Sequence, residues 1–171
     1  ITEKMRQPIL LVILQLAVLL IETYGDFTFG DIIAIKRLPT NKKGLFKHYA
    51  IYVGNEPFEG KKPEHDIFEF KGKSKGKDAP IANCLFSKLD MKAKPFMDNY
   101  LDNLKGYKVG TKDEIKKRIE EKYRDCGPYK PKKNNCEHLA TYVRYGVRVS
   151  IQVSHLGRRH LICKHISSLH V

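Results

Sequence analysis

The sequence predicts an α+β domain, because β-type segments are grouped in the first half of the chain and helical patterns follow in the second half. Residues 32–35, 48–54 and 66–70 are rich in β-branched and aromatic residues and are bounded by turn-forming residues, which is typical of strands. Residues 111–124 and 136–145 repeat apolar side chains at helical spacing. We therefore expect a small sheet packed against helices.

The strands have faces that can be assigned from alternation. In residues 48–54, His48, Ala50 and Tyr52 fall on one face, and the apolar residues between them fall on the other. In residues 66–70, Glu69 faces away from the two phenylalanines beside it. A further strand is expected within residues 79–89, whereas residues 91–110 give mixed signals and no prediction.

Both helices carry recognisable start signals. Thr111 and Glu114 form a capping box, and Gly127-Pro128 stops the first helix after about Arg124. The second helix follows Asn134-Asn135, since asparagine is a good N-cap, and it should end at about Tyr145 before a glycine.

Cys136 lies at the start of the second helix, where free backbone N–H groups and the helix macrodipole favour a negative charge. Such a position lowers the pKa of a thiol and raises the fraction of thiolate, which is the nucleophilic form. Cys136 is therefore a candidate nucleophile. The alternative is a buried structural cysteine, the commoner fate of a lone cysteine in a helix, and only a nearby base favours the first reading.

His48 is the candidate base, because it lies on a strand and so has a fixed position. A group that accepts from the imidazole would have to orient it, and Glu69 and His65 are the candidates. We favour Glu69, because it lies within a strand while His65 is at the end of a loop. One cysteine and one distant histidine are a weak signal when taken alone.

At 171 residues with 42% hydrophobic residues, the chain can form one domain with its own core. The 32 Lys and Arg residues against 19 Asp and Glu residues give a formal net charge of +13. This charge suits phospholipid headgroups or nucleic acid, and equally a simple solvated surface. No recognised nucleic-acid-binding motif accompanies it, so we expect a membrane surface and no nucleic acid as partner.

The four cysteines, Cys84, Cys126, Cys136 and Cys163, show no Cys-x-x-Cys pair and no Cys/His spacing typical of zinc. We therefore predict no metal and no other cofactor. A domain of this size does not need disulfides for stability, so the thiols are expected to be mostly free.

Three regions are expected along the chain. Residues 1–25 carry basic residues followed by an apolar run, which predicts a signal peptide or a short N-terminal membrane anchor. Residues 26–150 form the domain, and residues 151–171 are expected to be a loosely structured basic tail.

The segment around Cys136 closely resembles a known family signature. It reads Asn134-Asn135-Cys136-Glu137-His138-Leu139-Ala140 and continues to Arg144-Tyr145-Gly146. This resembles the Asn-Cys-Glu-His…Arg-Tyr-Gly signature of the lecithin:retinol acyltransferase-like family, and in particular its H-Ras-like suppressor group of phospholipases and acyltransferases. Gly30-Asp31, the segment His48 to Gly54, and Pro128-Tyr129 also look like motifs of that family, in the expected order.

The resemblance implies a circularly permuted papain-like fold of the NlpC type, with a small antiparallel sheet and the catalytic cysteine at a helix N-terminus. It also implies acyl transfer: a fatty acyl group moves from a glycerophospholipid onto the cysteine as a thioester, and then to water, an amine or an alcohol. N-acylphosphatidylethanolamine synthesis is one such reaction. By this resemblance Cys136 is the nucleophile and His48 the base, while Tyr129 and Asn135 line the site near the oxyanion.

Two features depart from the family pattern. The usual third residue is a second histidine, whereas this chain has Glu69, and many relatives carry a hydrophobic C-terminal anchor that this sequence does not show. A catalytically weak member of the fold that binds acidic membranes or a protein is therefore the alternative to an acyltransferase or phospholipase A. An NlpC-type cell-wall peptidase is disfavoured by the Asn-Cys-Glu-His motif.

The expected location follows from these readings. An acyltransferase that uses phospholipids should be associated with a membrane, at its cytoplasmic face or at the endoplasmic reticulum. If residues 1–25 are a cleaved signal, secretion is the alternative.

Overall fold

The computed structural model describes residues 27–37, 46–71 and 82–152. The predictions for residues 1–25, for Cys163 and for most of the C-terminal tail lie outside this part of the chain. Within it, no helix is both long enough and apolar enough to cross a membrane.

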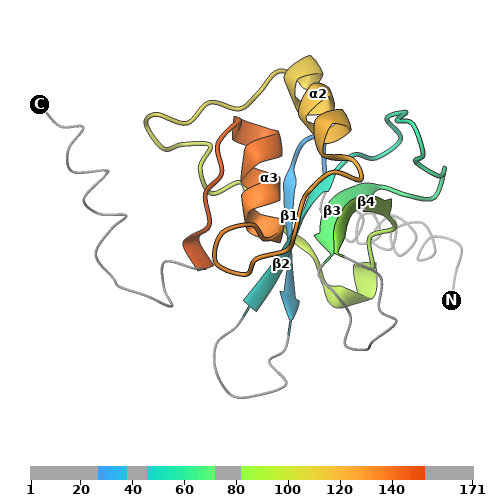
Figure 1. Cartoon of the computed structure of the whole chain (residues 1–171), viewed down its shortest axis with the longest axis horizontal. Coiled ribbons are helices and arrows are strands. Elements are labelled where there is room, and N and C mark those ends of the chain that lie inside the picture. Colours follow the sequence, from blue (N-terminus) through green and yellow to red (C-terminus); the bar gives the residue numbers. More distant parts are fainter. Residues whose placement is uncertain (1–26, 38–45, 72–81, 153–171) are drawn as a thin grey trace, which may run out of the picture.

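A five-stranded antiparallel sheet is the centre of the domain (Figure 1). The strands are β1 (Ile32–Arg37), β2 (Phe46–Tyr52), β3 (Ile67–Lys71), β4 (Asn83–Ser87) and β5 (Phe96–Met97). Their order across the sheet is β4-β3-β2-β1-β5. The predicted α+β class is confirmed, and β4 lies within the range where a fourth strand was expected.

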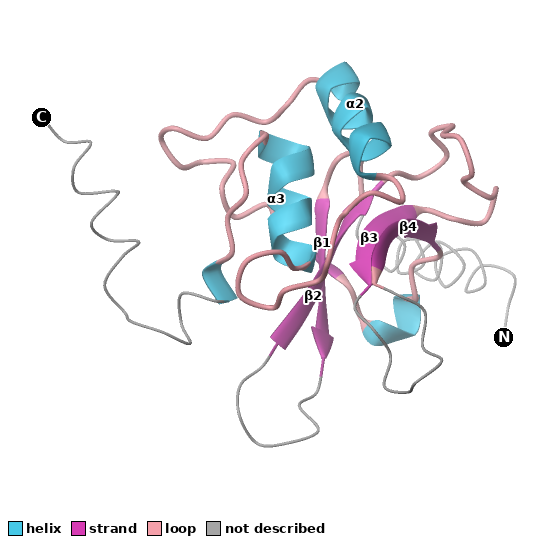
Figure 2. Cartoon of the chain, viewed as in Figure 1, coloured by secondary structure: helices cyan, strands magenta, loops and turns pink. Residues whose placement is uncertain are grey.

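Helical elements accompany the sheet, and Figure 2 shows how they are placed around it. They are the short 3-10 helix η1 (Met91–Ala93), α2 (Lys112–Lys122) and α3 (Cys136–Tyr145). Residues 91–110, for which the sequence made no prediction, supply η1, the edge strand β5 and turns. The edge strand β5 is short and pairs with β1 at two positions, Ile33↔Met97 and Ala34↔Phe96.

The helix starts confirm the predicted capping. Thr111 accepts a hydrogen bond from the backbone of Glu114, whose side chain in turn accepts from the Thr111 N–H. Asn135 is the N-cap of α3, and Gly146 ends that helix in a left-handed conformation with φ of 74°. A left-handed residue is most easily glycine, which explains why α3 ends there.

The main core lies between the sheet and the helices. Residues at alternate positions of β2, including Tyr49 and Ile51, face this core together with Phe68 and Phe70 of β3. α3 contributes Leu139 and two further apolar side chains, Ala140 and Val143. The intervening strand residues, such as Ala50 and Ile67, form a smaller cluster of their own, as the alternation predicted.

Arg144 connects the end of α3 to the start of β1. Its guanidinium donates to the Gly30 carbonyl at 2.8 Å and forms ion pairs with Asp31 at 3.3 Å and Asp102 at 2.7 Å. The Gly30-Asp31 motif and the arginine of the helix motif therefore meet in space. This buried network fixes α3 relative to the sheet.

A disulfide joins Cys84 of β4 to Cys126, with the two Cα atoms 5.6 Å apart. The expectation that the thiols are mostly free is therefore wrong for this pair. The two residues are 42 positions apart, so their spacing carries no local signal. They meet because the segment after α2 runs beside β4, where the Arg124 N–H donates to the Cys84 carbonyl. Cys136 is the free cysteine among the described residues.

Candidate active site

Cys136 is the first residue of α3, and only 5% of its surface is exposed. The Asn135 side chain accepts from the backbone N–H groups of Glu137 and His138 at 2.9 and 3.0 Å. Its amide group also donates to the Pro131 carbonyl at 2.7 Å, which ties the preceding loop to the helix start. Asn135 therefore acts as a cap that holds Cys136 in place at the start of α3.

Several donors converge on the Cys136 sulfur. Burial raises the pKa of the thiol, but the hydrogen bond and positive charge of His48 lower it, as do the backbone N–H of Tyr49 and the Tyr129 hydroxyl. The net effect is a lowered pKa. A thiol with a lowered pKa at a helix N-terminus is the environment of a nucleophilic cysteine rather than of an inert one.

His48 is buried on β2, and its Nε2 atom lies 2.5 Å from Oε2 of Glu69. Burial lowers the pKa of the imidazole, but its hydrogen bonds to Cys136 and Glu69 raise it, and the balance raises the pKa to about 9. The imidazole therefore contacts both the Glu69 carboxylate and the Cys136 thiol. The site is therefore suited to a thiolate and imidazolium pair at neutral pH.

Glu69 comes from β3, and the strand register brings it to His48. Ala50 pairs directly with Glu69, and His48 lies two residues before Ala50 on the same face of β2. The carboxylate is 3% exposed and remains charged, because its hydrogen bonds lower its pKa to about 2 although burial alone would raise it. His48, Lys71 and Ser87 are the groups that lower it.

The second oxygen of Glu69 has partners of its own. Lys71 Nζ lies 2.6 Å from Oε1, and the Ser87 hydroxyl donates to the same atom. These contacts orient the carboxylate so that Oε2 is directed at the imidazole. A carboxylate held in this way stabilises an imidazolium, as aspartate does in serine triads.

His65, the other candidate for orienting His48, lies in the turn before β3. Its Nδ1 atom is buried and has no hydrogen-bond partner among the described residues. Since Glu69 contacts the imidazole directly, the structure brings together Cys136, His48 and Glu69 and leaves His65 apart.

Tyr129 is held beside the cysteine by its ring, which packs edge-on against Phe70 with centroids 4.9 Å apart. Its hydroxyl reaches the Cys136 sulfur. Tyr129 therefore brings a hydrogen-bond donor to the Cys136 sulfur.

Glu137, the residue after the cysteine, is completely buried, and its side chain binds the segment that follows α3. Its carboxylate accepts from the Ile151 N–H at 2.8 Å and the Gln152 N–H at 3.2 Å, and from the Tyr100 hydroxyl at 3.0 Å. The Gln152 side chain then clamps the Lys47 peptide, accepting from its N–H at 2.7 Å and donating to its carbonyl at 3.1 Å. Lys47 immediately precedes His48.

The sequence alone does not predict that Lys71, Ser87 and Gln152 support the site. Lys71 and Ser87 could have been found from the strand alternation, because each shares a face with Glu69 once β3 and β4 are paired. Gln152 had no local signal. Within residues 27–37, 46–71 and 82–152, no group of three His, Cys, Asp or Glu side chains is arranged to hold a metal ion.

The fold and this site define a small α+β domain in which a buried cysteine at a helix start meets a histidine and a carboxylate from the sheet. The model of the family described as lecithin retinol acyltransferase matches residues 26–149 of the chain. The chain belongs to this family, whose membership supports acyltransferase or phospholipase-type activity in general. A search of curated proteins found no match.

Proposed function

We propose that this protein transfers fatty acyl groups from a glycerophospholipid through a thioester on Cys136, and that it releases them to water as a phospholipase A or passes them to another acceptor. The observation that carries this proposal is the hydrogen-bonded series from Cys136 through His48 to Glu69. In a family of acyltransferases, a nucleophile, a base and an orienting carboxylate in contact are the parts that acyl transfer requires.

In the first half of the reaction, the Cys136 thiolate attacks the carbonyl carbon of the lipid ester. The tetrahedral oxyanion forms near the helix start, where the Tyr129 hydroxyl can donate to it. As the carbon–oxygen bond of the ester breaks, the His48 imidazolium gives its proton to the departing oxygen. The products are a lysophospholipid and the thioester of Cys136.

In the second half, neutral His48 removes a proton from water, an amine or an alcohol as that acceptor attacks the thioester. The carbon–sulfur bond breaks and Cys136 returns as the thiolate beside the imidazolium. Glu69 keeps its charge throughout and stabilises the imidazolium at each stage. The order of His48 on β2 before Cys136 on α3 supports our inference that the domain has the circularly permuted papain-like arrangement.

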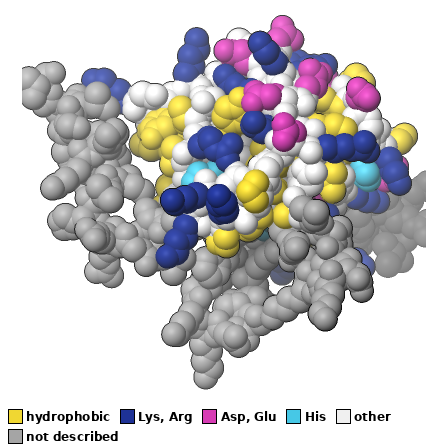
Figure 3. Space-filling view, in the orientation of Figure 1, with side chains coloured by type: hydrophobic (Ala, Val, Ile, Leu, Met, Phe, Trp, Pro, Cys, Tyr) yellow, Lys and Arg dark blue, Asp and Glu magenta, His cyan; other side chains and the backbone are white. Residues whose placement is uncertain are grey.

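We further propose that the protein works at a membrane surface, because its acyl donor is a lipid and its net charge is +13. Figure 3 shows Lys and Arg side chains distributed over the visible face, with acidic side chains gathered near α2. Near β5, Lys36 and Lys47 both lie over the Phe96 ring, at 5.5 and 5.1 Å, and the adjacent Met97 is 55% exposed. Basic and apolar groups in one place suit an anionic bilayer.

The disulfide between Cys84 and Cys126 supports an oxidising compartment, since such bonds persist in the secretory pathway and are rare in the cytosol. We therefore propose the lumen of the endoplasmic reticulum or the cell exterior in preference to the cytoplasmic face. Residues 1–25, read as a signal peptide or an anchor, would then direct the domain there. N-terminal sequencing of the protein from cells distinguishes a cleaved signal from a retained anchor.

The proposal is tested by incubating the protein with phosphatidylcholine labelled in one acyl chain and measuring fatty-acid release. We expect release by the wild type and none by Cys136→Ala or His48→Asn. His65→Asn is the matched control, because it removes a histidine that makes no hydrogen bond to the catalytic residues, and it should keep the activity. Equal fatty-acid release by the wild type and by Cys136→Ala would contradict the proposal.

The acceptor and the acyl position are resolved in the same assay. Separate reactions contain water alone, phosphatidylethanolamine as an amine, or a retinoid alcohol, and the labelled product identifies which acceptor takes the acyl group. Labelling the sn-1 or the sn-2 chain in turn shows which ester is attacked.

A further inference from the structure

A hollow lined by aromatic rings lies on the opposite face of β4 from Ser87, which contacts Glu69. Phe86 of β4 forms its floor and is 6% exposed, while Phe58 and Tyr123 form its walls. Phe86 lies 5.2 Å from Phe58 and 5.1 Å from Tyr123 between ring centroids. The volume of the hollow, about 70 Å³, is well above the ~10–15 Å³ needed for one water molecule.

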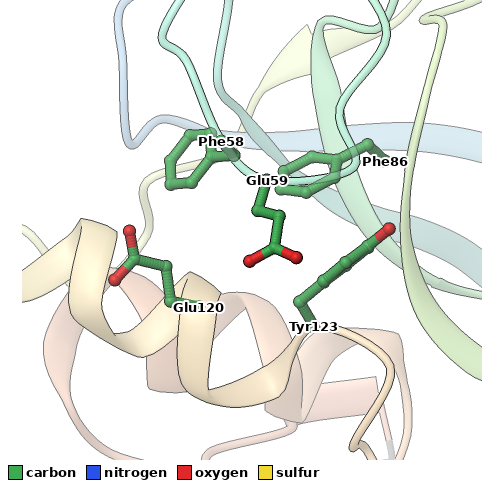
Figure 4. A pocket seen from close by; sticks show the side chains of 5 residues that line it. All are labelled: Phe58, Glu59, Phe86, Glu120 and Tyr123. Carbon is green, nitrogen blue, oxygen red and sulfur yellow. The ribbon is translucent and has the colours of Figure 1, made fainter.

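Two carboxylates, from Glu59 and Glu120, also line this aromatic hollow. Figure 4 shows Glu59 at its centre, with Glu120 and Tyr123 on one side and the two phenylalanines on the other. Within the described residues, neither carboxylate takes part in an ion pair, although Lys and Arg residues greatly outnumber Asp and Glu residues in this protein. The hollow therefore combines unpaired negative charge with aromatic rings, and this combination attracts cations.

The walls of the hollow are held in position by the fold. A Cβ atom on Gly60, which has φ of 72°, would overlap the Tyr123 hydroxyl, so the loop packs directly against that ring. Phe86 packs on Phe68 of the core, with centroids 5.1 Å apart. The rings already contact cations of the protein itself, since Lys116 lies 5.6 Å from the centroid of Phe58 and Arg124 lies 4.9 Å from that of Tyr123.

We propose that this hollow binds a quaternary ammonium group, such as the trimethylammonium of choline. A primary ammonium brings three N–H donors, and the aromatic walls would leave some of them unpaired. A quaternary ammonium has no N–H donor, is apolar at its surface and carries a full charge. It therefore fits three rings and two carboxylates.

This site is separate from the catalytic cysteine. Phe86 and Ser87 are neighbours on β4 and point to opposite faces of the sheet, so Phe86 lines the hollow while Ser87 donates to Glu69. Cys136 packs in the same core cluster as Phe86, but the groups that contact its thiol, from His48, Tyr49 and Tyr129, are not among the residues that line the hollow. A ligand in the hollow would therefore leave these groups in place. The proposal concerns binding alone and does not depend on the proposed acyl transfer.

The test is a titration of the full-length protein, followed by NMR of backbone amides. Choline and tetramethylammonium should shift the amides of residues 58–60, 86 and 120–123. The neutral isostere 3,3-dimethylbutan-1-ol has the same shape without the charge. Its affinity should be lower than that of choline by about three- to fivefold or more. Equal binding of the neutral compound would overturn the proposal.

Variants locate the site. Glu59→Gln and Phe58→Leu should each weaken choline binding about three- to fivefold, because the first removes a charge and the second removes a ring while keeping an apolar side chain. Glu64→Gln is the matched control, as an exposed carboxylate of the same loop outside the hollow, and it should bind choline like the wild type. Wild-type affinity in Glu59→Gln and Phe58→Leu would contradict the assignment.

Two further experiments ask whether the ammonium group comes from a lipid headgroup or from free choline, and whether choline binds at the catalytic cysteine. Phosphocholine binding at least as tightly as choline indicates a lipid headgroup, whereas binding of choline alone indicates the free compound, and both results support an ammonium site. Saturating choline should leave the rate of Cys136 alkylation unchanged. Protection of Cys136 by choline would place the ligand at the catalytic cysteine and overturn the proposal.

Discussion

The Glu69 carboxylate lies 2.5 Å from Nε2 of His48, and both side chains are buried. Strand register brings the two together, and Lys71 and Ser87 hold the carboxylate from its other side. The carboxylate and the imidazole therefore form a charged pair beside Cys136.

Replacing Glu69 by Gln should reduce acyl transfer by about 100-fold or more, because an amide does not stabilise the imidazolium as a carboxylate does. Ser87→Ala is the milder companion, since it removes one donor to Glu69 and leaves the His48 contact, and its loss should be below about tenfold. The initial rate of fatty-acid release measures both. A Glu69→Gln protein as active as Ser87→Ala would argue against the orienting role.

Glu69→His separates an active enzyme from a catalytically weak member of the fold. If the natural carboxylate is competent, restoring the family's histidine should not raise the rate more than about twofold, because both groups can orient His48. A large gain in the same assay would show that the natural site is impaired and would favour the binding-protein alternative.

The titration of His48 should depend on Cys136. The pKa of His48 is raised to about 9, and among the causes that raise it the hydrogen bond to Cys136 comes first, so Cys136→Ala should lower this pKa. NMR of the His48 ring protons across pH 5–10 measures the effect. A His48 pKa near its ordinary value of about 6.5 in both proteins would contradict the ion pair.

The raised pKa of His48 also makes the free energy of unfolding depend on pH. The charged imidazole contributes stability that is complete below about 6.5 and is lost as the pH rises through 9. Glu69, with its pKa lowered to about 2, contributes above about 4.3, and this contribution is lost as the pH falls through 2. Urea unfolding at pH 6 and at pH 9.5 should therefore show a lower free energy of unfolding at the higher pH, by more in the wild type than in His48→Asn.

Glu137 should be needed for stability and, through Gln152, for the position of His48. Glu137→Gln places an amide donor against the N–H groups of residues 151 and 152, and it should cost about 1.5–3 kcal/mol in urea unfolding. Gln152→Ala should cost less than about 1 kcal/mol and still slow Cys136 alkylation, because it releases the Lys47 peptide beside His48. An unchanged alkylation rate in Gln152→Ala would remove the positioning role.

Reduction of the Cys84–Cys126 bond should lower the free energy of unfolding by about 2–4 kcal/mol, because the bond closes a loop of 42 residues. Urea unfolding with and without a reductant measures this. The double variant Cys84→Ala/Cys126→Ala is the control, and its midpoint should not respond to the reductant. A wild-type midpoint that is equally insensitive would show that the bond is absent in solution.

The order of strands and helices could be predicted from the sequence because the signals for it are local. The alternation around His48, the capping box at Thr111 and the asparagine before Cys136 each determine a few neighbouring residues, and the structure has the corresponding elements. The contact between His48 and Glu69 followed from the assumption that their strands are neighbours, and the register of β2 and β3 supplies it.

The features that the sequence did not predict depend on contacts between distant segments. The disulfide joins Cys84 and Cys126 only because the segment after α2 returns to β4, and Gln152 reaches Lys47 across 105 positions. The edge strand β5 has only two residues, so it is too short for a periodic signal. Tertiary packing determines these features, and a pattern within one segment cannot show it.

The central claim is that Cys136 accepts the acyl group, and intact-protein mass spectrometry tests it most directly. The protein is mixed with phosphatidylcholine at pH 7, quenched in acid within the first turnovers, and digested to locate any adduct. The account predicts an acyl thioester on Cys136 that hydroxylamine removes and that is absent from Cys136→Ala. Lipid cleavage that proceeds with no adduct on Cys136, and at the same rate in Cys136→Ala, would contradict it.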